Sequence, residues 1–168
     1  FMSETALDRM QKLGVGVDVQ PGWMYYDVPA LQRVFGIDKM RWFFPLRSFF
    51  ERGIPVAGGS DHMIGFNKSA AVNSFNPFLN MWMCMVRRTR LGQPFYPAES
   101  VTREQALRMW TTGPAWLQFA EGERGSLEPG KLADFVLIDR DFLTVPTDEI
   151  RETGVVETWV EGRVVHRR

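Results

Sequence analysis

Residues 53–62 have the sequence Gly-Ile-Pro-Val-Ala-Gly-Gly-Ser-Asp-His, and this stretch decides how the whole chain is interpreted. Its apolar part predicts a short buried strand. Gly58 and Gly59 follow, and because glycine has no Cβ they let the backbone pass where a side chain would clash. Asp61 and His62 would then lie at the carboxyl end of the strand, where parallel α/β folds place their chemistry.

The residues before this strand alternate between helical and strand patterns. Ser3 is typical of a helix N-cap, the apolar residues after it are spaced three and four apart, and Gly14 is typical of a helix end. Valines at 15, 17 and 19 alternate with other residues and predict a strand. A second helix is predicted over residues 45–52. Helix, strand, loop, helix and strand in this order predict two consecutive units of a parallel sheet or barrel.

Residues 22–40 are predicted to form an aromatic loop that contains one short helix near residues 29–35. The loop carries Trp23, Tyr25 and Tyr26 just after the first predicted strand. Aromatic side chains in this position can line a pocket, so Trp23 and Tyr25 are candidate substrate-binding residues. Packing of the same rings onto neighbouring helices explains them equally well.

A long helix is predicted to begin at Asn76-Pro77, where a capping side chain is followed by proline in the first turn. It is apolar almost all round, so we expect it to be buried, with the arginines that follow residue 86 acting as cations at its C-terminus. Thr102 and Gln105 form a capping box for a further helix. Gly113-Pro114 is expected to break that helix.

The sequence changes character after Gly125. A Pro-Gly turn at 129–130, a strand at 135–138 and a hairpin over 155–166 are predicted with no helix between the strands. These strands therefore belong to a different sheet from the first two.

Composition excludes several classes of protein. The chain has 168 residues, a formal net charge of zero and one cysteine, Cys84. A neutral chain carries no electrostatic signature for nucleic acid or an anionic membrane, and no apolar run approaches the ~20 residues that span a bilayer. A single cysteine fits a reducing compartment, and charged residues interrupt the N-terminus too early for a signal peptide. We therefore expect a cytoplasmic protein.

Two motifs resemble those of a known family. Residues 125–139, Gly-Ser-Leu-Glu-Pro-Gly-Lys-Leu-Ala-Asp-Phe-Val-Leu-Ile-Asp, resemble the segment that returns amidohydrolase-superfamily chains from their barrel to a small β-sandwich. The Gly-Ser-Asp at 59–61 is similar to the metal-site end of that superfamily's eighth barrel strand. Residues 102–107 and 160–165 fit as well, and the loop composition resembles the branch that includes N-substituted formamide deformylases.

The resemblance implies an α/β fold, the C-terminal part of a (β/α)8 TIM-type barrel followed by strands of a small β-sandwich. Residues 1–122 would hold the last two β/α units of the metal-dependent hydrolase barrel and the helices after them. Residues 123–168 would hold C-terminal strands of the sandwich. The chain begins at Phe1 and almost directly on a helix, so we expect an incomplete C-terminal fragment of a longer protein.

The resemblance also implies a divalent metal, with zinc as the expected ion. Of the family's ligands, which are mostly histidines on earlier strands, only the strand-eight aspartate has a counterpart, Asp61. The two histidines of the chain, His62 and His166, cannot complete a zinc site. The metal is therefore expected in the full-length protein and absent or weakly bound here. His62 is a candidate substrate contact, and His166 is expected on the surface.

Asp61 would serve as both metal ligand and catalytic residue. A carboxylate beside a metal-activated water can accept its proton and hand it to the leaving nitrogen. Without the second motif, Asp61 is equally explained as a turn residue or a helix cap.

The implied function is metal-dependent hydrolysis of a non-peptide carbon–nitrogen bond in an amide-like small molecule, and deamination or ring opening of a cyclic amide would use the same aspartate. A non-catalytic interaction or regulatory protein that retains part of the fold is the alternative. Apolar faces left uncovered by an incomplete barrel would favour a homodimer.

Overall fold

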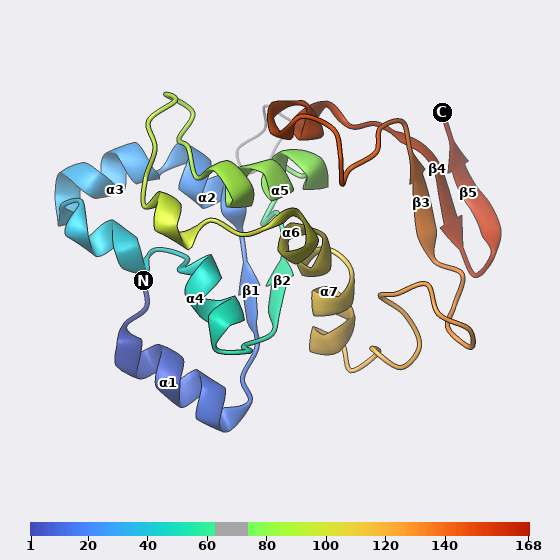
Figure 1. The fold of residues 1–168 in the computed structure, drawn as a ribbon, viewed down its shortest axis with the longest axis horizontal. Coiled ribbons are helices and arrows are strands. Elements are labelled where there is room, and N and C mark those ends of the chain that lie inside the picture. The colour runs from blue at the N-terminus through green and yellow to red at the C-terminus, as the bar shows by residue number, and fades with distance from the viewer. Residues whose placement is uncertain (63–73) are drawn as a thin grey trace.

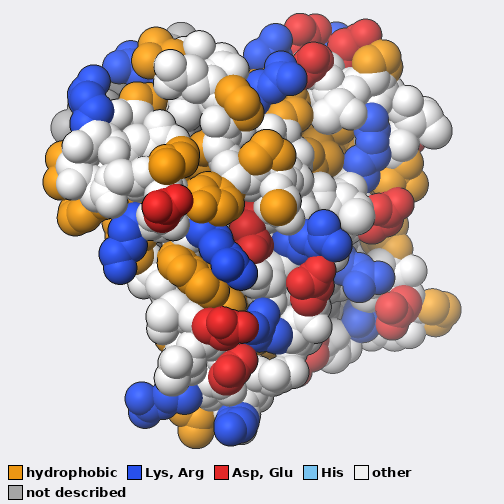
Figure 2. All heavy atoms as spheres, turned by 60° about the vertical axis from the view of Figure 1, so that its left-hand side comes forward, with side chains coloured by type: hydrophobic (Ala, Val, Ile, Leu, Met, Phe, Trp, Pro, Cys, Tyr) orange, Lys and Arg blue, Asp and Glu red, His pale blue; other side chains and the backbone are white. Residues whose placement is uncertain are grey.

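The chain folds into a helical body around a short parallel sheet, and a separate antiparallel sheet stands beside it (Figure 1). The structure, a computed structural model, describes residues 1–62 and 74–168. None of the helices in those ranges is long and apolar enough to cross a membrane. Acidic and basic side chains are interspersed over the face shown in Figure 2, as expected of a chain with no net charge.

The first helix and strand form as the sequence predicts. In α1 (Glu4–Leu13) the Ser3 hydroxyl accepts a hydrogen bond from the Ala6 backbone N–H, and Gly14 ends the helix with a φ of 65°. The strand β1 (Val17–Val19) then pairs in parallel with β2 (Val56–Gly58), which confirms the predicted parallel arrangement. Both strands are shorter than predicted.

The segment between the two strands is more helical than predicted. It contains α2 (Pro21–Tyr26), α3 (Val28–Phe35), the 3-10 helix η1 (Asp38–Trp42) and α4 (Leu46–Glu51). The short helix predicted near residues 29–35 is confirmed as α3, whereas α2 was missed because Pro21-Gly22 was interpreted as the turn that ends the strand. Each of α2 and α3 carries proline in its first turn, where a backbone N–H has no helical partner in any case.

The long helix α5 (Pro77–Val86) is the most buried element of the body. The Asn76 side chain caps it by accepting hydrogen bonds from the backbone N–H groups of Phe78 and Leu79, as predicted. Every residue from Phe78 to Cys84 is buried.

Arg87 lies at the C-terminus of α5, where a cation was predicted, but it has a further role that the sequence did not indicate. Its side chain is fully buried and donates to the backbone carbonyls of Phe43, Phe44 and Phe95. The guanidinium also lies 4.4 Å from the centre of the Phe95 ring. Burial lowers the pKa of Arg87 to about 10, so the group still carries its charge at neutral pH. It joins three segments that are distant in sequence.

Two short helices cover one side of β2 after the 3-10 helix η2 (Pro97–Glu99). Thr102 and Gln105 form the predicted capping box of α6 (Arg103–Met109). The break before α7 (Thr112–Leu117) lies at residues 110–111 and not at Gly113-Pro114, which stand inside the first turn of α7. Proline is tolerated there, and Gly113 is required by packing, since a Cβ at this position would lie 2.0 Å from the Val56 carbonyl oxygen.

The core lies between the parallel sheet and the helices around it. Trp110 packs so closely on β2 that a Cβ on Gly58 would lie 2.5 Å from its ring. The largest fully buried apolar side chains come from all parts of the helical body: Leu7, Met24, Met40, Leu46, Phe49, Met83, Phe95 and Met109.

The C-terminal strands form their own sheet, as predicted. The strands β3 (Phe135–Ile138), β4 (Val155–Val160) and β5 (Arg163–Arg167) pair antiparallel in that order, with the 3-10 helix η3 (Thr147–Glu152) between β3 and β4. In the described part of the chain no second sheet covers this one, so the β-sandwich stays a prediction.

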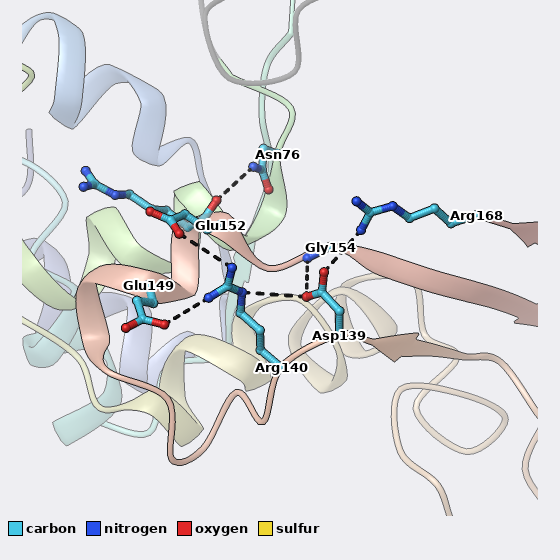
Figure 3. A network of polar contacts seen from close by, with 8 residues as sticks. Asn76, Asp139, Arg140, Glu149, Glu152, Gly154 and Arg168 are labelled. Atoms are coloured by element: carbon cyan, nitrogen blue, oxygen red, sulfur yellow. Dashed lines mark hydrogen bonds and ion pairs between the residues drawn. The ribbon is translucent and has the colours of Figure 1, made fainter.

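A polar network ties this sheet to η3 (Figure 3). Asp139, just after β3, accepts a hydrogen bond of 2.8 Å from the Gly154 backbone N–H at the start of β4. Arg140 forms ion pairs of 3.0 Å with Glu149 and 3.6 Å with Glu152. The loop between β3 and β4 is therefore held at both ends.

Candidate functional site

Asp61 lies three residues beyond the end of β2, at the carboxyl end of the parallel sheet. Gly59 continues the strand pairing, since its N–H donates to the Val19 carbonyl over 2.8 Å. The backbone at Asp61 has a φ of 47°, in the left-handed region that costs a non-glycine residue about 1–2 kcal/mol. A strained residue at a strand end is a frequent feature of functional sites.

Trp23 is the predicted site residue that the structure brings directly to Asp61. Its indole Nε1–H donates a hydrogen bond of 3.3 Å to Asp61 Oδ2. The contact joins α2 to the end of β2 across 38 positions of sequence. The indole thus faces the one residue that the sequence singled out for chemistry.

Asp18, in the middle of β1, is a neighbour of the candidate site that the sequence reasoning did not single out. A Cβ on Gly59 would lie only 3.1 Å from Asp18 Oδ1, so the carboxylate lies directly against the chain that leads to Asp61. Partial burial raises the pKa of Asp18, an effect that the hydrogen bond from Gln20 opposes and the charge of Asp61 strengthens. The sequence signal that could have identified Asp18 is an acidic residue between two valines of a predicted strand.

The other predicted residues, Tyr25 and His62, pack against different aromatic rings. The Tyr25 ring packs edge-on against Trp82 of α5, with ring centres 6.2 Å apart. His62 is exposed, and its ring lies edge-on to Phe75 at 4.6 Å. His166 is exposed on β5, as expected.

A metal ion would need more ligands than this part of the chain supplies. Among residues 1–62 and 74–168, no group of three or more His, Cys, Asp or Glu side chains could hold a metal ion. The carboxylate of Asp61 has suitable chemistry for one zinc ligand, but zinc sites use three or four protein ligands. The described residues therefore fit part of a metal site and not a whole one.

Comparison with known proteins gives one consistent result. A model of the Amidohydrolase family matches residues 1–166. The N-substituted formamide deformylase of Arthrobacter pascens is 34% identical over 171 residues, which cover 100% of this chain and 30% of the deformylase. The chain thus spans about 30% of the length of this curated relative.

Solved structures share the fold. Escherichia coli guanine deaminase has a TM-score of 0.66 and 19% identity, over 100% of this chain and 38% of the deaminase. A zinc-bound adenosine deaminase from Xanthomonas campestris has a TM-score of 0.65 and 19% identity, over 97% of this chain and 34% of that protein. The predicted α/β fold class is confirmed, because these structures contain the same arrangement.

Proposed function

The chain belongs to the Amidohydrolase family, and from that premise we propose that it is part of a metal-dependent hydrolase that cleaves a non-peptide carbon–nitrogen bond in an amide-like small molecule. The observation that carries the proposal is the position of Asp61. Its carboxylate stands at the carboxyl end of a parallel strand, in a strained backbone conformation, and accepts a hydrogen bond from a half-buried indole.

The proposed active protein is longer than these 168 residues. The chain covers 30% of the deformylase it resembles, and its described residues supply one ligand of the proposed site. Residues 1–122 would be the last β/α units of a (β/α)8 barrel, and residues 123–168 the C-terminal strands of a β-sandwich. The remaining ligands would come from other barrel strands.

Asp61 has two tasks in the proposed reaction. A bound divalent ion, for which zinc is the proposed identity, would supply an activated water with a pKa near ~7. Asp61 would hold that ion, accept the proton of the attacking water and deliver it to the leaving nitrogen as the carbon–nitrogen bond breaks. Its place at the end of a hydrogen-bonded strand gives the carboxylate the fixed position that both tasks need.

The substrate would lie on the same side of the sheet as Asp61. Trp23, Tyr25 and His62 are the proposed contacts in this chain. The role of Trp23 is supported by its contact with Asp61. The Tyr25 ring packs against Trp82, so the substrate would have to reach it beside that ring.

A non-catalytic binding or regulatory role is the second candidate. The observation that favours it is the lack of a complete group of metal ligands in residues 1–62 and 74–168. Such a protein would keep the fold and bind its partner without turnover.

One experiment separates the two. The native protein is assayed against a panel of N-alkyl formamides and simple amides, before and after metal removal by a chelator and after zinc is restored. We expect metal-dependent hydrolysis, and we expect Asp61→Asn to lower kcat by about 10²–10⁴-fold, with Asp8→Asn on the exposed side of α1 as the matched control. Turnover that survives Asp61→Asn would refute the hydrolase proposal. A native protein that contains no metal as isolated, and that shows no turnover even after zinc is added, would also refute it.

A further inference from the structure

We propose that Trp23 is a positioning residue for Asp61, whose carboxylate it holds in one orientation through the indole N–H. The inference rests on the proposed function, since it assigns a role within the same site. A positioning role differs from substrate binding, in which the face of the indole ring would contact the substrate.

The polarity of the contact is fixed. An indole has one N–H donor and no acceptor, and a carboxylate oxygen is an acceptor. The 3.3 Å contact from Trp23 Nε1 to Asp61 Oδ2 therefore has one possible direction. Trp23 is half-buried and Asp61 is exposed, so the indole is the more restrained of the two partners.

The helix that carries Trp23 is firmly anchored. Its neighbours Pro21, Gly22 and Met24 are buried, and Met24 is only 1% exposed. The Met24 sulfur lies 3.5 Å from the guanidinium of Arg87, which in turn is held by three backbone carbonyls. The residue next to Trp23 is thus held in the buried centre of the molecule, which limits movement of the α2 backbone that carries the indole.

The proposed role of Asp61 depends on the orientation of its carboxylate. Asp18 lies against Gly59, two residues before Asp61, so a second carboxylate lies beside the chain that leads to Asp61. The indole N–H of Trp23 approaches Asp61 from α2, a different segment. It favours the orientation of the carboxylate in which Oδ2 points toward the indole. A carboxylate that must accept and then deliver a proton gains from this restraint, because proton transfer depends on heavy-atom geometry.

Phenylalanine separates the two possible roles of Trp23. Trp23→Phe removes the N–H and keeps an aromatic face. Loss of a positioning hydrogen bond lowers kcat and leaves KM unchanged, whereas loss of a substrate contact raises KM. Trp159→Phe is the matched control, because it removes an indole donor to a carboxylate, Glu157 Oε2 at 2.8 Å, on the separate sheet.

The first measurement is the kinetics of the native protein with an amide that it hydrolyses. We expect Trp23→Phe to lower kcat about tenfold, which corresponds to about 1.4 kcal/mol, with KM within about twofold of wild type. Trp159→Phe should leave both constants unchanged. An unchanged kcat, or a raised KM with kcat preserved, would overturn the inference.

The second measurement does not depend on turnover. In native protein labelled with ¹⁵N at the tryptophan indoles, the signal that disappears in Trp23→Phe belongs to Trp23. We expect this signal to move in Asp61→Asn and to stay in place in Glu157→Gln, which moves the Trp159 signal instead. A Trp23 signal that stays in place in Asp61→Asn refutes the contact. Where Trp23→Phe folds poorly, the Trp23 signal is identified by resonance assignment of the wild-type protein. If the native protein hydrolyses no amide while the signal moves as expected, the proposed function fails and the positioning contact stands.

Discussion

Gly113 offers the sharpest test of how the helices are packed on β2. Its place in α7 would put a Cβ 2.0 Å from the Val56 carbonyl oxygen, 2.9 Å from the Val56 carbonyl carbon and 3.1 Å from the Arg108 carbonyl oxygen. Non-bonded heavy atoms settle near ~3.5 Å. Gly113→Ala therefore requires α7 to withdraw from β2 by about 1.5 Å, or the strand to bend.

The expected cost follows from the atoms involved. Over-packing costs about 1–3 kcal/mol, and the upper end applies because the crowded atoms are backbone and cannot rotate away. Alanine recovers up to about 1 kcal/mol through its better helix propensity. The net loss is about 2 kcal/mol, which lowers Tm by about 4–8 °C for a domain of this size.

Thermal unfolding measured by circular dichroism tests this value. Gly122→Ala is the matched control, because no atom lies within 4 Å of its added Cβ and its backbone is not in the left-handed region. The control should have an unchanged or slightly raised Tm. If Gly113→Ala melted at or above the temperature of Gly122→Ala, α7 could not approach β2 as closely as described.

Two further changes probe the buried cation and the sheet network. Arg87→Met would leave the carbonyls that Arg87 binds without a donor, so we expect a loss of about 3 kcal/mol and a Tm lower by about 6–12 °C; an unchanged Tm would mean that the carbonyls find other donors. The pKa of Asp139 is lowered by the hydrogen bond from the Gly154 N–H and by the charges of Arg140 and Arg168. A carboxylate with a lowered pKa stabilises the fold at pH values above its pKa in the unfolded chain, about 4, and this stabilisation is lost as pH falls through its pKa in the folded chain. Asp139→Asn should therefore lower Tm at pH 7, with the difference from wild type shrinking below pH ~4, and a difference independent of pH would contradict this origin.

Local signals in the sequence predicted local structure well. The cap at Ser3, the Asn76-Pro77 start of α5 and the capping box at Thr102 depend on residues a few positions apart, and each is present. Pro21, which begins α2, misled the prediction, because the same residue type marks turns and the first turns of helices.

Features that depend on distant segments were missed for a physical reason. Arg87 is satisfied by carbonyls about 43 positions earlier and 8 positions later, and nothing local distinguishes it from the exposed arginines beside it. Asp61 could be singled out because its position after a predicted strand occurs together with the family-like motif at residues 125–139. The contacts of Asp61 with Trp23 and of Asp18 with Gly59 required the register of β1 against β2, which no short motif encodes.

The left-handed backbone at Asp61 limits what evolution or an engineer can place there. Glycine, asparagine and aspartate accept this conformation with the least strain, whereas β-branched residues are strongly disfavoured. Asparagine is therefore the clean probe, because it removes the charge and keeps the conformation. Glycine would release the strain but lose the carboxylate, so the most relaxed residue for this turn is one that could not carry out the proposed chemistry. At this position the fold gives up stability to retain an acid.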